Sequence, residues 1–368
     1  MSRLLLISLG QLNGHILEAA ARSGKFAEIV VAGRNSDYGL QKTNQARIGA
    51  AIEGRYPAIR FEELDVNRAS AAGKLRAIAP DVALAAPSML PWWRIDRLAG
   101  PAATAARAVP FAGWLACHLA PMLAVRRAWV DSGLSSAWVG ASYPDVVNVI
   151  LARTGPAPVC GVGNVDEVVP KVRFAVAGKS GCDPAKVKVR LVAQHALEYY
   201  VYRERATAPQ DAPPFMLHAE LDGRDLSAEA RAGLFAPFPI PYELDFNLLT
   251  AASALKLLPA LAGQGAVDMH VPAPNGLPGG YPVRVDGGTV SLDLPAGWPQ
   301  EEAMASNLAS LPWDGLASIE TDGAAVFTEP AARSLFDLTG HAYEALHPGA
   351  AGNMAAALLA AVADNGPR

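Results

Sequence analysis

Short apolar runs alternate with helical segments over roughly the first 165 residues, and this rhythm constrains the fold more than any other feature of the sequence. The runs are continuous rather than alternately apolar and polar, as strands need to be when helices cover both faces of a sheet. Strands separated by helices indicate βαβ units and a parallel sheet. The expected strands are 4–9, 28–32, 61–66, 81–86, 137–140 and 158–161, and the expected helices are 16–22, 42–56, 71–78, 121–132 and 146–153.

The rhythm changes after about residue 165. A connecting helix is expected over 166–177, and period-two alternation over 186–203 and 213–221 predicts a mixed or antiparallel sheet. Later expected elements are an apolar helix (245–261), a Gly- and Pro-rich loop (272–280), a strand or hairpin (283–294), a helix (300–310), a hairpin around Asp322, and helices from 330 and over 350–364.

We therefore predict an α/β protein with two unlike domains. Residues 1–165 would form a Rossmann-like, doubly wound parallel sheet that binds a dinucleotide. Residues 166–328 would form an α+β domain for substrate binding or dimerisation, and the helices of 329–368 would return to the first domain.

Composition excludes several classes of partner. The net charge is −4, with 18% charged and 51% hydrophobic residues, so no basic field is expected to hold nucleic acid or an anionic membrane. No uninterrupted apolar run approaches the roughly 18 residues of a membrane span.

Three cysteines without a CxxC pair favour a reducing, cytoplasmic location. His341 and His347 lack metal-ligand spacing, so no metal is expected. The expected partner is a small-molecule substrate. A homodimer is expected only because most oligomers are symmetric dimers.

The first strand is followed by a degraded dinucleotide fingerprint. Where G-x-G-x-x-G would stand, Ser8 replaces the first glycine, while Gly10, Gln11, Leu12, Asn13 and Gly14 form the turn. Glycines let the backbone approach a pyrophosphate, and the following helix N-terminus offers free N–H groups. The alternative is a tight strand-to-helix turn without a ligand.

The ends of the next strands predict which cofactor would bind. Arg34 can pair with a 2′-phosphate, with Asn35 and Ser36 as neutral donors, which favours NADP(H) while NAD(H) stays possible. Asp65 could approach the adenine edge or cap a helix. The residues expected beside the ribose and nicotinamide are Ala86, Pro87 and Ser88.

The order of these pieces resembles the saccharopine dehydrogenase-like family of NAD(P) oxidoreductases. The segments that carry the resemblance are 31–35, 61–67, 81–87, 117–133 and 158–170, so it covers about the first 175 residues. It implies a Rossmann-like domain, a nicotinamide cofactor and an amino-acid-like, carboxylate-bearing substrate. The glycine turn departs from the pattern, and from Leu191 onward no motif of the family is present.

Three side chains are candidates for the proton transfer of such a reaction. His195 falls on the apolar face of the expected strand 186–203, which makes it either a core residue or a group facing substrate. Tyr143 follows a strand end, where ligands bind in this kind of sheet. His118 follows Cys117, a pairing that hints at a thiol nucleophile, although neighbours on a helix point apart.

The stiff loop after His270 predicts a substrate wall or lid, with a rigid surface connection as the alternative. Its polar candidates for binding substrate are His270, Asn275, Tyr281 and Arg284, of which Arg284 could bind a carboxylate.

The sequence thus predicts an NADP(H)-dependent dehydrogenase or reductase acting at a C=O or C=N carbon, or in reverse on an alcohol or amine. Two alternatives stay open. One is a non-catalytic, dinucleotide-binding regulatory protein, which the missing first glycine favours. The other is a non-redox enzyme that retains a bound nicotinamide.

Overall fold

The computed structural model describes residues 2–363. Its first sheet consists of five parallel strands in the order β3-β2-β1-β4-β5. The strands are β1 (Arg3–Ile7), β2 (Glu28–Gly33), β3 (Ala58–Glu63), β4 (Val82–Ala85) and β5 (Ala137–Gly140). A parallel bridge between Val139 and Cys160 places the expected sixth strand beside β5. This order confirms the predicted doubly wound sheet.

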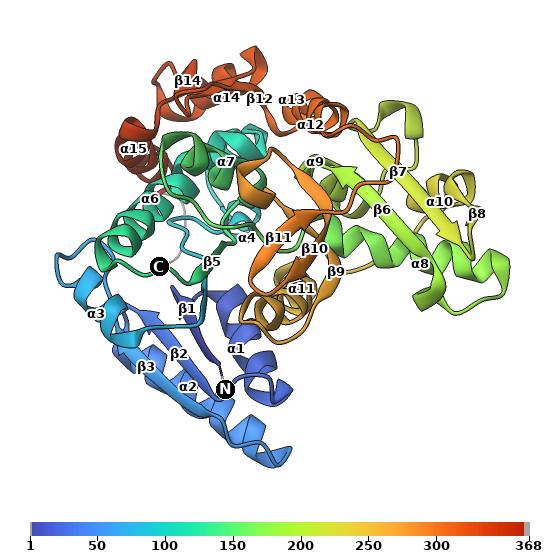
Figure 1. The fold of residues 1–368 in the computed structure, drawn as a ribbon. Coiled ribbons are helices and arrows are strands. Elements are labelled where there is room, and N and C mark those ends of the chain that lie inside the picture. Colours follow the sequence, from blue (N-terminus) through green and yellow to red (C-terminus); the bar gives the residue numbers. More distant parts are fainter. Residues whose placement is uncertain (1, 364–368) are drawn as a thin grey trace.

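Alternate residues of the buried strands pack into two separate hydrophobic cores, one on each face of the sheet. Leu4 and Leu6 pack with α1 (Gln11–Ser23), α2 (Ser36–Ile52) and α11 (Asn247–Leu261) on one face. Leu5 and Ile7 pack on the other face with α3 (Ala71–Ile78), α6 (Leu115–Ser132) and α7 (Pro144–Thr154). Helices therefore cover both faces, which explains the continuous apolar runs of these strands (Figure 1).

The helix α6 begins six residues earlier than expected and contains Pro121. Proline lacks the N–H that would bond the carbonyl oxygen of Cys117. That oxygen instead accepts from the backbone N–H of Met89 at 2.9 Å. A tertiary contact therefore replaces the missing helical hydrogen bond, which is why the helix continues through a residue that would normally end it.

The second unit is built on an antiparallel sheet in the order β11-β10-β6-β7-β8, and β9 also pairs with β10. Its strands are β6 (Lys188–Ala193), β7 (Phe215–Leu221), β8 (Arg224–Asp225), β9 (Val267–Pro272), β10 (Gly280–Asp286) and β11 (Thr289–Leu292). The helices α8 (Val165–Ser180) and α10 (Ser227–Leu234) pack together over β6 and β7. The change to an antiparallel sheet agrees with the period-two patterns.

The strand expected over 186–203 is correct only as far as Ala193. The chain then forms α9 (His195–Glu198) and the π-helical turn η3 (Tyr199–Arg203). The Gln194 side chain accepts from the N–H of Ala196 at 2.9 Å and so caps α9. Leu197 and Val201, four residues apart, are buried in the core under α8. The same residues therefore satisfy a helical period, and tertiary packing selects it.

The C-terminal part lies against the helices of the first unit (Figure 1). A small sheet of β12 (Leu316–Ile319), β13 (Ala325–Phe327) and β14 (Ala345–Leu346) leads into two helices. The first, α14 (Glu329–Thr339), contacts α5 (Ala102–Ala108), and the second, α15 (Ala351–Ala363), contacts α6. The remaining α-helices are α4 (Trp92–Asp96), α12 (Gln300–Ala309) and α13 (Leu311–Asp314).

Among residues 2–363, one unbent helical segment, Leu244–Leu261, has the length and hydropathy of a membrane-spanning helix. Half of it is buried in the structure, where α11 packs against α1. Packing in a protein core therefore accounts for its apolar composition.

Candidate active site

The turn between β1 and α1 keeps the shape of a phosphate-binding turn although its first glycine is replaced. Ser8 holds a left-handed backbone conformation with φ of 74°, which glycine adopts most readily. The amide nitrogen of buried Asn13 donates to the carbonyl oxygens of Ile7 (2.9 Å) and Ser8 (2.7 Å). These hydrogen bonds brace the turn, so the Asn13 side chain serves its geometry.

Helix α1 begins here with Gly10 as its N-cap, followed by uncharged residues in its first turn. A Cβ on Gly10 would have open space around it among residues 2–363. Gln11 and Leu12 are half-buried and line a cavity, while Gly14 is buried and faces Lys42 of α2. Free N–H groups and the helix dipole favour an anion at such a position. The residues present therefore fit the pyrophosphate of a dinucleotide.

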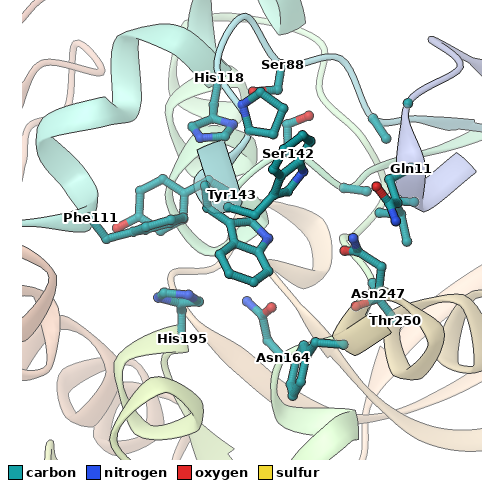
Figure 2. Close-up of a pocket in the computed structure, with 18 of the residues that line it drawn as sticks. Gln11, Ser88, Phe111, His118, Ser142, Tyr143, Asn164, His195, Asn247 and Thr250 are labelled. Carbon is teal, nitrogen blue, oxygen red and sulfur yellow. The ribbon is translucent and has the colours of Figure 1, made fainter. Parts of the chain in front are cut away.

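The cavity has a volume of about 920 Å³ and runs from the glycine turn to the second unit. Figure 2 shows Gln11 on one side of it and His195 and His118 farther along, with Asn164 rising from the second unit. Its position at the carboxyl edge of a parallel sheet is where folds of this class bind ligands.

The end of β4 contributes two residues to the cavity wall. Ala86 and Ser88 line it together with Ser142, which follows β5. Pro87 stands behind this wall, and its carbonyl oxygen accepts from the Ser142 hydroxyl at 2.6 Å. The two strand ends are thereby tied together beneath the cavity.

The four residues expected at the adenosine end lie outside the cavity, at the ends of β2 and β3. The Asn35 side chain accepts from the N–H of Tyr38 and caps α2, and the Ser36 hydroxyl donates to Glu63 at 3.0 Å. Hydrogen bonds from Asn67 and the nearby charge of Arg34 hold the pKa of Asp65 below its usual value. Arg34 is exposed.

A buried carboxylate organises the opposite end of the cavity. Asp314, the last residue of α13, lies 3.1 Å from Nδ1 of His195 and accepts from the hydroxyl of Tyr143 at 2.8 Å. Gln194 donates to the same carboxylate at 3.2 Å. Although His195 lies on α9 instead of the expected strand, it does line the cavity. Its ring and Tyr143 therefore meet through a residue from the distant C-terminal part.

This arrangement changes the protonation of both groups. Burial alone would lower the pKa of His195, but the charge and hydrogen bond of Asp314 raise it to about 9. Burial and Asp314 raise the pKa of Tyr143 above its usual range. Tyr143 also has a left-handed backbone with φ of 47°, a strain typical of functional sites. At neutral pH the site therefore holds an imidazolium beside a neutral phenol.

Phe111 lies between two histidines of different character (Figure 2). Its ring stacks on the His195 ring, with the two ring centroids 4.6 Å apart. The His118 ring is tilted relative to it, and those two centroids are 6.0 Å apart. Burial and the charge of His195 lower the pKa of His118 to about 4. Both His118 ring nitrogens lack a hydrogen-bond partner within the part of the chain that the structure describes. His118 is therefore a neutral group with two unused polar atoms at the cavity.

The neighbouring thiol is unsuited to nucleophilic chemistry. Cys117 is buried in the first core, and burial raises its pKa to about 12. Cys117 and His118 are neighbours on α6, and side chains of adjacent helical residues point apart.

Further carboxyl groups lie deeper in the second unit. Glu198 and Glu167 line the cavity, and burial raises the pKa of Glu198 to about 7. Glu167 accepts from the Thr250 hydroxyl at 2.6 Å. On α7 of the first unit, Tyr143 occupies the N-cap position, and buried Asp145 accepts from Asn164.

The four residues proposed to bind substrate lie away from the cavity. Buried His270 accepts the N–H of Leu191 at Nε2 (3.1 Å), and the Tyr281 hydroxyl donates to the carbonyl oxygen of Pro278. Asn275 donates to the carbonyl oxygen of Val290, while exposed Arg284 pairs with Asp268 at 3.0 Å. These four side chains therefore bind groups of β6, β9, β11 and the loop between β9 and β10.

Sequence reasoning missed the residues that complete the site. Asp314 is 119 positions from His195 and belongs to no recognisable motif. Glu198 was not a candidate, because 186–203 was expected to be a strand, and the helical turn at α9 brings it into the interior. A helical reading of 195–203 would have placed it correctly, but no sequence signal indicates Asp314.

Comparisons with known proteins show which solved structures share this fold. No family model and no curated protein match this sequence. A lactate dehydrogenase from a Medee basin deep-sea metagenome library matches with a TM-score of 0.57 and 11% identity over 85% of this chain and 96% of its own. The malate dehydrogenase of Plasmodium falciparum gives 0.55 and 11% over 85% and 96%. The lactate dehydrogenase of Cryptosporidium parvum, complexed with lactic acid and NAD, gives 0.51 and 16% over 85% and 98%.

At this level of identity the likeness shows the fold, a Rossmann-like sheet followed by an antiparallel α+β unit. It confirms the predicted fold class. These neighbours are lactate and malate dehydrogenases, so the more specific resemblance to the saccharopine dehydrogenase-like family stays a prediction.

Proposed function

We propose that this chain is an oxidoreductase that uses NADP(H), or alternatively NAD(H), to transfer hydride to or from a C=O or C=N carbon of a small metabolite. One observation carries the proposal. A single cavity joins an open helix N-terminus, suited to a pyrophosphate, to an ion-paired histidine suited to proton transfer. Proteins of the same fold are dehydrogenases, and one was solved with NAD and lactic acid.

The first unit would hold the cofactor. The backbone N–H groups around Gly10 and Gln11 would bind the pyrophosphate, and Arg34 would pair with a 2′-phosphate beyond β2. Ala86 and Ser88 would border the nicotinamide end. When bound there, the cofactor supplies the hydride.

Residues of the second unit would transfer the proton to and from the substrate. In the reducing direction, the substrate carbon gains a hydride and its oxygen or nitrogen must gain a proton. The His195 imidazolium would donate that proton and take it back in the oxidising direction. Asp314 stabilises the charged ring and fixes its orientation. Since the Tyr143 hydroxyl donates to Asp314, we assign Tyr143 a positioning role, and neutral His118 a hydrogen bond to substrate.

The expected substrate carboxylate requires a cation at the cavity. Arg107 on α5 lines the cavity and donates to the carbonyl oxygen of Leu98. Arg203 is engaged by Asp96 at 2.8 Å. We therefore assign carboxylate binding to Arg107 in place of Arg284.

The cellular setting is inferred from the cysteines. Cys117, Cys160 and Cys182 are all free, as is usual in a reducing cytoplasm. A cytoplasmic location is therefore part of the proposal, and a homodimer stays a prediction.

A fluorescence titration with reduced nicotinamide cofactors tests the proposal. We expect saturable binding of NADPH, weaker binding of NADH, and a loss of roughly 1–3 kcal/mol in NADPH affinity for Arg34→Ala with little change for NADH. Arg68→Ala, which removes an exposed arginine near the same strand end, is the matched control. Failure of both cofactors to bind at about 1 mM would refute the proposal. Binding without turnover over a panel of carbonyl and imine substrates would favour the regulatory alternative.

A further inference from the structure

The deep end of the cavity contains two buried carboxyl groups from different elements. Glu198 ends α9 and is 3% exposed, and Glu167 lies in the first turn of α8 and is 7% exposed. Both line the cavity. Oε1 of Glu198 lacks a hydrogen-bond partner among the residues that the structure describes. A buried polar atom of this kind is costly unless a ligand satisfies it.

Three aromatic rings line the same cavity as these carboxyl groups. Tyr242 lies 5.5 Å from Trp92 and 6.1 Å from Tyr199 between ring centroids, and all three line the cavity. Burial, and after it the charge of Glu198, raise the pKa of Tyr242. Aromatic faces attract cations within about 6 Å, and more strongly where water is excluded.

Three of the protein's own cations already have partners. Arg203 packs over Tyr242 and is paired with Asp96 at the cavity rim. His195 is paired with Asp314. Lys171 lies over the ring of Tyr202, and its pKa is lowered to about 8 by burial. Burial, and after it the charge of Glu198, raise the pKa of Glu167, so the negative charge left for a ligand is that of Glu198.

We propose that Glu198, Glu167 and the Tyr242, Tyr199 and Trp92 rings form a binding site for a cationic nitrogen group, such as an ammonium, carried by the substrate. This inference rests on the proposed function, since the site lies in the same cavity as His195. The substrate is then an amine-bearing metabolite, held by its cation at Glu198 with its reacting carbon toward His195. An anionic group would be repelled there.

A metal ion is a poorer occupant of this site. Within residues 2–363, no group of three or more His, Cys, Asp or Glu side chains is arranged to hold one. Hard cations need six or more oxygen ligands, whereas this site offers two carboxyls and aromatic faces. Carboxylate plus ring is the combination that recognises an organic ammonium ion.

Three matched four-carbon probes test the site: butylammonium, butanol and butyrate. Their binding is measured by saturation-transfer NMR at pH 8 and 0.1 M NaCl, with and without NADPH. We expect butylammonium to bind at least tenfold more tightly than the other two. Glu198→Gln should abolish that preference, whereas Glu204→Gln, which removes an exposed carboxylate at the same cavity, should change it less than twofold.

Each result decides the matter. Equal binding of the three probes, or an unchanged preference in Glu198→Gln, would overturn the proposal. If Glu198→Gln fails to fold, Tyr242→Leu removes the central ring and should lower butylammonium affinity at least fivefold. NADPH affinity is measured on the same samples. If NADPH binds but butylammonium is not preferred, this inference alone is refuted. If butylammonium is preferred but NADPH does not bind, the cofactor proposal alone is refuted.

Discussion

Replacing Asp314 by asparagine should neutralise His195, because this carboxylate is what keeps the buried ring charged. The two side chains have the same shape, so the amide oxygen of the asparagine can still accept from the Tyr143 hydroxyl. The Asp314 carboxylate lies 3.1 Å from Nδ1 of the ring, and removing its charge leaves burial as the strongest influence on the pKa. We therefore expect the pKa of His195 to fall from about 9 to near or below 6.5.

The same change predicts a pH-dependent loss of stability. A rise from 6.5 to about 9 corresponds to roughly 3 kcal/mol at 1.36 kcal/mol per pKa unit. Because the folded pKa is raised, this stabilisation is fully present below pH 6.5 and is lost as the pH rises through about 9. Asp314→Asn should therefore lower the free energy of unfolding by about 3 kcal/mol at pH 5.5, and by much less above pH 9.

Two measurements check this prediction. Ring-resolved NMR titration of the histidines, assigned with His195→Gln, reports the pKa, and urea unfolding between pH 5.5 and 9.5 reports the stability. Asp268→Asn, which breaks the exposed pair with Arg284, is the control and should cost less than about 1 kcal/mol. A His195 pKa that stays near 9 in Asp314→Asn would refute the assignment of Asp314 as the group that charges the ring.

Two further predictions concern the cofactor turn and the thiols. Gly10→Ala should leave the unfolding free energy within about 0.5 kcal/mol, because φ of −96° suits alanine and the space is open. It should nevertheless weaken NADPH at least tenfold by placing a methyl group where the phosphates approach, whereas Gly73→Ala in α3 should not; equal affinities would contradict the assigned turn. Iodoacetamide at pH 8 should modify Cys182 in the native protein but spare Cys117, whose buried thiol has its pKa raised to about 12. Mass spectrometry checks this, and rapid native labelling of Cys117 would contradict its placement.

The local sequence was informative wherever one element decided the outcome. The buried runs around Leu5 and Val30 predicted the parallel sheet because only strands covered on both faces are apolar throughout. The turn at Gly10 was predicted without its first glycine, and Ser8 adopts a left-handed conformation there while Asn13 braces it. His195 was found as a candidate, although on the wrong kind of element.

Contacts between distant segments decided the rest. Pro121 would end a helix on its own, and only the approach of Met89 to the carbonyl oxygen of Cys117 lets α6 continue. Leu197 and Val201 fit either a strand or a helix until the core beneath α8 selects the helix, and that choice turns Glu198 inward.

The sequence by itself determined the layered α/β architecture and the position of the turn between β1 and α1, because periodicity and backbone freedom act over a few neighbouring residues. Tertiary structure alone decided the chemistry of the far end of the cavity. The pKa of His195 depends on a carboxylate 119 positions away, and charge interactions act through space rather than along the chain.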